Sequence, residues 1–184
     1  YGFVYAQHRF ALPLQSKEFF GLSGAAIFGT CMTLNAALVI FLSTPVMALT
    51  RKWKPINAVA LAGIFYAVGF GMIGISRNLW LLYLSTILWT LGEIVNATNE
   101  GAYVANHTPI SHRGRFNAVL PVIGGIGWTI SPPVIGGLID KIGVGSVWPL
   151  IGAIAFAAAV LIWALGKIED KVAARAPAVV EKTE

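Results

Sequence analysis

Four polar side chains interrupt one long apolar helix of this chain, and they are the residues best suited to chemistry. The run 79–91 reads LWLLYLSTILWTL, and Glu93, Asn96, Asn99 and Glu100 follow it. Residues three and four apart share a helical face, so Glu93, Asn96 and Glu100 form one polar stripe, with Asn99 to one side. A carboxylate in a lipid-spanning helix costs about 2.5–3.5 kcal/mol on insertion scales, and it usually marks a transport pathway or a proton site.

Glu93 is the candidate for a proton or cation site. It lies about 14 residues from each end of its helix, which at 1.5 Å per residue is roughly 20 Å from either membrane surface. At that depth it could bind and release a proton or hold a cationic substrate. The alternative is that Glu93 only pairs with a neighbouring helix, but Ser or Asn would fix packing at lower cost.

Five further side chains are expected to line a cavity near Glu93 or to support it. Asn96 shares its face, and Trp89 lies one turn earlier, where it either packs or stacks on a substrate. Asn35 either bonds between helices or lines the cavity. Arg9 either extends toward the membrane surface or acts as a counter-ion. The candidates are Gln7, Arg9, Asn35, Trp89 and Asn96.

A second charged group is expected at one end of the polar helix. Glu100 lies about five residues inside the membrane interface, and the basic turn HTPISHRGR follows. We expect Glu100 to form a gate or a structural pair with Arg113 or Arg115, or with Arg51 across a helix interface. Such pairs can form in one state of a membrane protein and open in another.

The composition is that of an integral membrane protein. Of the 184 residues 57% are hydrophobic and 11% are charged, whereas soluble domains carry about 25% charged residues. The mean hydropathy is +0.73. The net charge of +5 does not indicate a nucleic-acid partner, because the basic residues lie between the apolar runs and in the tail.

The residues indicate no enzyme, metal or cofactor. Cys31 is the single cysteine, and the histidines at 8, 107 and 112 lack the spacing of a metal site. No glycine-rich phosphate motif follows a strand. We therefore expect no catalytic residues and no bound metal.

The apolar runs predict an all-α membrane protein, because a span needs about 20 apolar residues. The bundle is expected over 1–168, and 169–184 is expected to be a disordered cytoplasmic tail. The first run is too short to cross, ends near Pro13 and begins without Met, so we expect the C-terminal piece of a longer chain. The expected spans are 1–14 (partial), 19–50, 56–76, 79–108, 116–139 and 147–166.

The basic residues predict the orientation in the membrane. The turn 51–54 carries three Lys or Arg residues, the turn 113–115 carries two, and the start of the tail carries two. The opposite turns carry one each, at Lys17, Arg77 and Lys141. Because cytoplasmic loops are rich in Lys and Arg, the C-terminus is expected in the cytoplasm. Short loops favour a bacterial inner membrane.

Four motifs follow one another along the chain: Tyr5-Ala6-Gln7 with Leu12-Pro13-Leu14, Asn35–Val39 with Pro45, Gly92-Glu93-Ile94 running on to Pro109 and Arg113-Gly114-Arg115, and Pro132–Gly137. Their order resembles the C-terminal half of a major facilitator superfamily transporter, in particular its drug:proton antiporter branch. Pro132 stands where the family usually has Gly, and Thr50 and Trp53 replace the Asp and Gly of a family loop.

The resemblance implies a six-helix C-terminal bundle with its first helix truncated. It also implies an N-terminal bundle that is missing from this sequence, with the substrate site near the membrane midplane between the two bundles. The bundles would rock against each other, so that the site opens to one side of the membrane at a time. The function implied is a proton-coupled secondary transporter that exports small amphipathic or cationic compounds. Its partners would be the substrate, protons and the lipid bilayer.

Two alternatives stay open. One is a proton symporter or uniporter for a sugar, nucleoside or organic acid, and an Arg9 facing the cavity would favour an anionic substrate. The other is a non-transporting membrane scaffold, which predicts that the Glu93 stripe is fully packed against a neighbouring helix.

Overall fold

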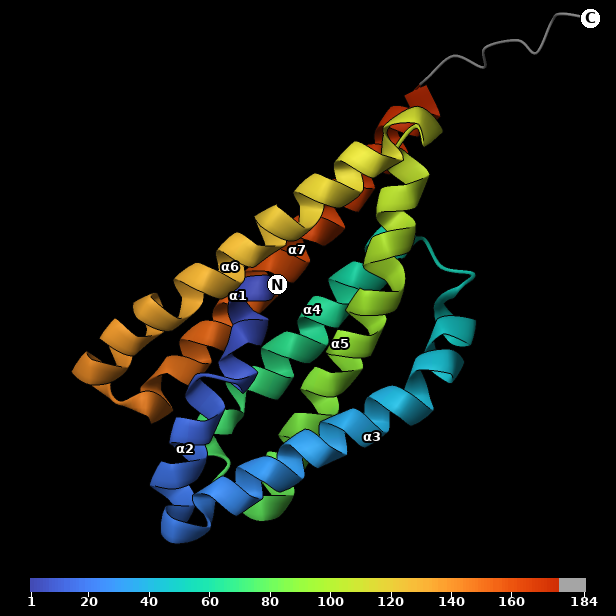
Figure 1. Cartoon of the computed structure of the whole chain (residues 1–184). Coiled ribbons are helices and arrows are strands. Elements are labelled where there is room, and N and C mark those ends of the chain that lie inside the picture. The colour runs from blue at the N-terminus through green and yellow to red at the C-terminus, as the bar shows by residue number, and fades with distance from the viewer. Residues whose placement is uncertain (176–184) are drawn as a thin grey trace, which may run out of the picture.

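The computed structural model describes residues 1–175, apart from the side chain of Asn117, and within that range all regular structure is helical (Figure 1). Short 3₁₀ turns join several of the helices. The expected all-α membrane fold is confirmed. The helices are α1 (Gly2–Tyr5), α2 (Ala11–Phe20), α3 (Gly24–Thr50), α4 (Pro55–Gly71), α5 (Leu79–His107), α6 (Arg113–Ile142) and α7 (Val144–Arg175).

The first turn of the chain lies later than expected. The sequence suggested a helix end near Pro13 and a turn at 15–18, with the next span starting at 19; instead α2 continues to Phe20 and α3 begins at Gly24. Pro13 is the third residue of α2, where a helix has no partner for the backbone N–H, so it does not break the helix. The turn occurs at Gly21, whose φ of 55° suits glycine.

Two further helix limits differ from the expected ones. α4 ends at Gly71, and a 3₁₀ turn, Ile73–Ile75, completes the expected span to 76. α7 runs to Arg175, so residues 169–175 are helical and not part of a disordered tail. The ion pair between Lys54 and Asp170 holds this extension against the turn before α4. The rest of the expected tail, 176–184, lies outside the described residues.

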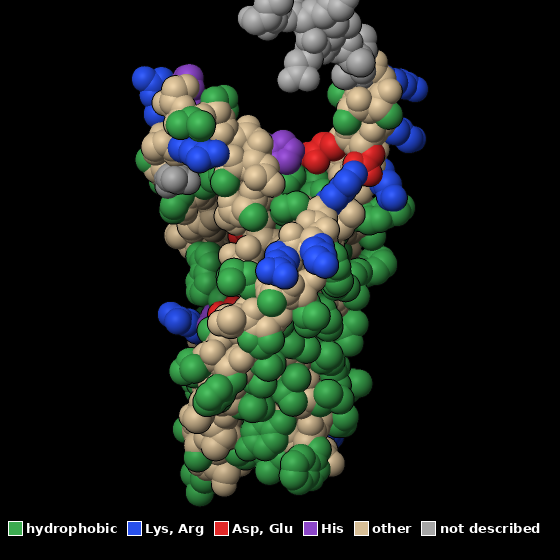
Figure 2. All heavy atoms as spheres, turned by 90° about the vertical axis from the view of Figure 1, so that its right-hand side faces the viewer, with side chains coloured by type: hydrophobic (Ala, Val, Ile, Leu, Met, Phe, Trp, Pro, Cys, Tyr) green, Lys and Arg blue, Asp and Glu red, His purple; other side chains and the backbone are tan. Residues whose placement is uncertain are grey.

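Five helical segments in the described chain are long and apolar enough to cross a membrane. The first, Gly2–Thr50, contains the turn at Gly21 and therefore folds back on itself, as Figure 1 shows. Figure 2 shows charged side chains gathered toward one end of the molecule above a largely hydrophobic surface. The other segments are Pro55–Ile75, Leu79–His107, Ile110–Ile142 and Val144–Arg175.

The helices α4, α5 and α7 form the tightly packed part of the bundle. Rings of Phe70, Trp89 and Trp148 stack in its core, with Phe70 5.6 Å from Trp89 and 6.4 Å from Trp148. Glycines let the backbones approach. A Cβ on Gly69 of α4 would lie 2.6 Å from the backbone nitrogen of Trp89, and one on Gly152 of α7 would lie 2.9 Å from the carbonyl oxygen of Ala67. By contrast few residues of α3 and α6 are fully buried.

We expect Gly69→Ala to destabilise the bundle by about 1–3 kcal/mol, because the added methyl group must push α5 away from α4. The matched control is Gly101→Ala in α5, where a Cβ meets nothing within 4 Å. Alanine there should leave stability unchanged or raise it by up to about 1 kcal/mol. Thermal unfolding in detergent, followed by helical circular dichroism, measures both. Equal midpoints for the two variants would contradict this account of the α4–α5 contact.

Candidate functional site

Glu93 lies in the middle of α5 and faces α3. Its side chain is half-buried, and Asn35 of α3 donates a hydrogen bond from Nδ2 to Oε2 of Glu93 at 2.7 Å. The same amide group donates to Oγ1 of Thr90 at 3.1 Å. Among the described residues, no Lys or Arg is within ion-pair distance of Glu93. The carboxyl group is therefore held by neutral donors and has no basic partner among the described residues.

Aromatic side chains surround the other side of Glu93. The hydroxyl of Tyr5 lies close enough to interact with its carboxylate. The ring of His8 stacks on Trp89 with 5.6 Å between centroids, and Tyr5 contacts both rings. The indole Nε1 of Trp89 is buried and has no hydrogen-bond partner among the described residues. The site thus combines one carboxylate with a wall of polarisable rings.

A cavity of about 390 Å³ lies next to this site, and we call it the inner cavity. Five helices contribute to it, because Tyr5, Tyr66, Trp128 and Ile162 come from α1, α4, α6 and α7, while Asn96 and Glu100 come from α5. Ligand pockets in proteins usually measure about 300–1,000 Å³. The inner cavity is therefore large enough for a small organic molecule.

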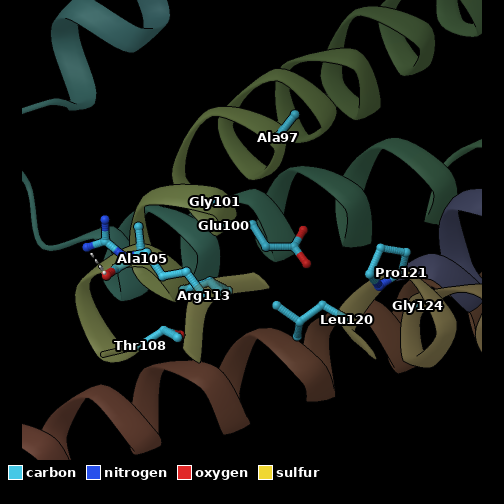
Figure 3. Close-up of a pocket in the computed structure, with 10 residues that line it drawn as sticks. Ala97, Glu100, Gly101, Ala105, Thr108, Arg113, Leu120, Pro121 and Gly124 are labelled. Carbon is cyan, nitrogen blue, oxygen red and sulfur yellow. Dashed lines mark hydrogen bonds between the residues drawn. The ribbon is translucent and has the colours of Figure 1, made fainter. Parts of the chain in front are cut away.

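A second cavity of about 460 Å³, here named the end cavity, lies between the ends of α5 and α6. The two cavities adjoin each other, because both are lined by Glu100, Leu120 and Gly124. Figure 3 shows the Glu100 carboxylate directed toward Leu120 and Pro121. Oε2 of Glu100 accepts a hydrogen bond from Nδ2 of Asn96 at 2.9 Å.

The expected gate pair of Glu100 is not formed. Nη2 of Arg113 donates instead to the carbonyl oxygen of Ala105 at 3.2 Å, and the guanidinium group points away from Glu100 (Figure 3). Arg51 and Arg115 are exposed, and no ion pair joins either of them to Glu100 in the described part of the chain. Arg113 thus bonds to a backbone carbonyl at the end of α5 rather than to the carboxylate in the cavity.

Two of the five expected cavity residues lie elsewhere. Gln7 is completely buried and donates to the hydroxyl of Ser131, so it fastens the 3₁₀ turn Ala6–His8 to α6. Arg9 is exposed, lies 6.0 Å from the ring centroid of Trp128, and donates from Nε to Nε2 of His8 at 3.1 Å. Gln7 therefore has a packing role, and Arg9 covers the outside of the aromatic group.

The other three lie at the Glu93 site or at the inner cavity. Asn96 lines the cavity, and Asn35 binds Glu93. Trp89 belongs to the buried stack rather than to the cavity wall. Asn99, which lies beside the polar stripe of α5, is buried. Its amide nitrogen donates to Oγ1 of Thr50 at 3.2 Å, so it fixes α5 to α3.

Sequence reasoning missed several residues of the site. Thr90 precedes Glu93 by three residues, a spacing that could have indicated its place beside the carboxylate. Tyr5, Tyr66 and Trp128 gave no such signal, because aromatic residues are frequent throughout membrane helices and these three meet only through helix packing.

The arrangement can bind a proton or a cation, and the described residues contain no cluster of three or more potential metal ligands. A half-buried carboxylate with neutral partners gains a counter-charge only by taking up a proton or a cation.

Comparison with known proteins agrees with this architecture. The sequence is 27% identical over 176 residues to the uncharacterized MFS-type transporter YhjO of Bacillus subtilis (strain 168), covering 92% of this chain and 42% of the relative. It is 22% identical over 123 residues to the uncharacterized MFS-type transporter YqjV of the same organism, covering 67% of this chain and 30% of the relative. The chain thus spans less than half the length of these relatives.

The family assignment follows from a match over nearly the entire sequence. The profile of the Major Facilitator Superfamily matches residues 1–183, a range that includes every helix described above. Members of this family are secondary transporters, which are not enzymes and which move small molecules across the membrane in which they are embedded. The chain belongs to the Major Facilitator Superfamily.

Proposed function

We propose that this chain is the C-terminal half of a proton-coupled transporter that exports small amphipathic or cationic compounds. In this proposal Glu93 is the proton site, and the inner cavity is this half's share of the substrate path. Transport proceeds by alternating access, with a second bundle completing the path.

The observation that carries the proposal is the environment of Glu93. The carboxylate is half-buried in the middle of an apolar helix and is bonded to Asn35, a neutral residue of the facing helix. A purely structural site would be expected to bury the group completely or to pair it with a cation. The partial exposure of Glu93 supports transport over a membrane scaffold.

The same contacts favour a cationic substrate over an anionic one. Arg9, the basic residue that could attract an anion, bonds to His8 and lies outside the two cavities described above. Glu100 is the acidic residue at the inner cavity, and Arg113 at the end cavity is directed away from it. A symporter or uniporter of an organic acid would need a cation facing the substrate.

The exposed helices support a second bundle. α3 and α6 carry large hydrophobic side chains that are more than half exposed, among them Ile40, Phe41, Val122 and Ile123. The relatives are more than twice as long as the parts that match this chain, so they contain enough sequence for another six helices. The drug:proton antiporter branch remains part of the proposal on the strength of the motifs around Glu93.

We expect Glu93→Gln to abolish substrate flux driven by a pH gradient, because the amide cannot carry the proton. The measurement is drug-cation efflux from proteoliposomes that contain the full-length transporter, with the inside and outside pH set independently. The matched control is Glu18→Gln, since Glu18 is an exposed carboxylate of α2 outside both cavities. Flux in Glu93→Gln equal to that of the wild type would remove Glu93 from the mechanism.

The proposed orientation places the turn 51–54 in the cytoplasm and Arg77 outside. Both Lys52 and Arg77 are exposed, so a cysteine at either position should react with a membrane-impermeant maleimide. In a Cys31→Ala background, Arg77→Cys should be labelled in intact cells, and Lys52→Cys should be labelled only in inverted vesicles. The reverse pattern would contradict the orientation inferred from the basic residues.

A further inference from the structure

We propose that the inner cavity binds an organic ammonium ion, with its charge on Glu100 and its apolar body against the rings of Tyr5, Tyr66 and Trp128. This inference rests on the proposed function, in which the chain moves cations. It goes further by proposing that Glu100 binds the positive charge of the substrate, while Glu93 binds the proton.

The position of Glu100 supports this assignment. Glu100 is exposed to both cavities, and no Lys, Arg or His within the described residues forms an ion pair with it. Arg113, the nearest expected partner, donates to the backbone of Ala105 instead. The carboxylate can thus pair with a cationic ligand inside a cavity of about 390 Å³.

Asn96 holds this carboxylate in place. One N–H of its amide group donates to Oε2 of Glu100 at 2.9 Å. The Glu100 carboxylate faces the inner cavity and keeps further acceptor positions on its two oxygens. A ligand that brings N–H donors and a positive charge complements this carboxylate.

The opposite wall is aromatic. Tyr5 contacts Tyr66 and Trp128 with ring centroids 5.8 and 5.6 Å away, and all three rings line the inner cavity. Aromatic faces attract organic cations and also pack against apolar groups. A metal ion would gain little here, because one carboxylate and three rings do not supply the oxygen ligands that hard cations require.

Glu93 and Glu100 then have different tasks. Glu93 is bonded to Asn35 across a helix interface, and Glu100 is bonded to a residue of its own helix and faces open space. They lie two turns apart on α5. The substrate and the proton would therefore occupy neighbouring sites on one helix rather than compete for a single carboxylate.

The test is equilibrium binding of two matched probes to the purified full-length transporter in lipid nanodiscs, by titration calorimetry at pH 7 without a pH gradient. 2-Phenylethylammonium carries a charge, and 2-phenylethanol has the same aromatic body without one. We expect the wild type to bind the cation at least about tenfold more tightly than the alcohol. Equal affinities for the two probes would overturn the proposal.

Variants assign the charge preference to a residue. Glu100→Gln should remove the preference and leave the affinity for the alcohol unchanged, while Glu100→Asp should keep most of it. Glu18→Gln is the control for a carboxylate outside the cavity. A full cation preference in Glu100→Gln would overturn the assignment, whether or not the protein transports anything.

Failure of the proposed function can be distinguished from failure of the ammonium site. If Glu93→Gln keeps wild-type proton-driven flux while Glu100→Gln loses the cation preference, the proton site is wrong and the ammonium site stands. If Glu93→Gln stops the flux and Glu100→Gln retains the preference, the transporter mechanism stands and this inference falls.

Discussion

The hydrogen bond from Asn35 to Glu93 is the interaction on which the rest of the structure depends. A carboxylate in the middle of a lipid-spanning helix must find polar partners within the protein. Here the partner comes from α3, a helix that has few fully buried residues but lies against α5. Asn99 adds a second contact of the same kind at Thr50. Together these two amides fix the face of α5 that turns toward α3 and therefore decide which side chains of α5 reach the inner cavity.

A second set of contacts packs α5 closely against α4. Gly69 and Trp89 bring α4 and α5 into backbone contact, and the stack of Phe70, Trp89 and Trp148 continues into α7. This packed side is rigid because its contacts are close and its side chains are bulky. The polar side carries Glu93 and Glu100, is only partly buried and borders the two cavities. One helix thus takes part both in the packed core and in the border of the two cavities.

Much of the fold could be predicted because an uncharged apolar run of about 20 residues is typical of a membrane-spanning helix and rare in soluble domains. The errors came where a local sequence signal was given too much weight. Pro13 suggested the end of a helix, although proline is tolerated in a first turn, and the charged residues after Lys167 suggested disorder, although Asp170 is paired with Lys54.

The site could be predicted only where a polar residue contrasts with an apolar run, as at Glu93. The aromatic wall and the direction of Glu100 depend on helix packing and on side-chain rotation, which spacing along the chain does not encode. For the same reason the expected pair between Glu100 and Arg113 could be named from the sequence but not placed.

The central claim is that Glu93 carries a proton that is exchanged for substrate. The most direct measurement is proton release on addition of pH-matched 2-phenylethylammonium to the purified full-length protein in weakly buffered detergent, followed with a pH indicator. The account predicts release of protons from the wild type and none from Glu93→Gln, with binding retained in both. Equal proton release from the two proteins would contradict it.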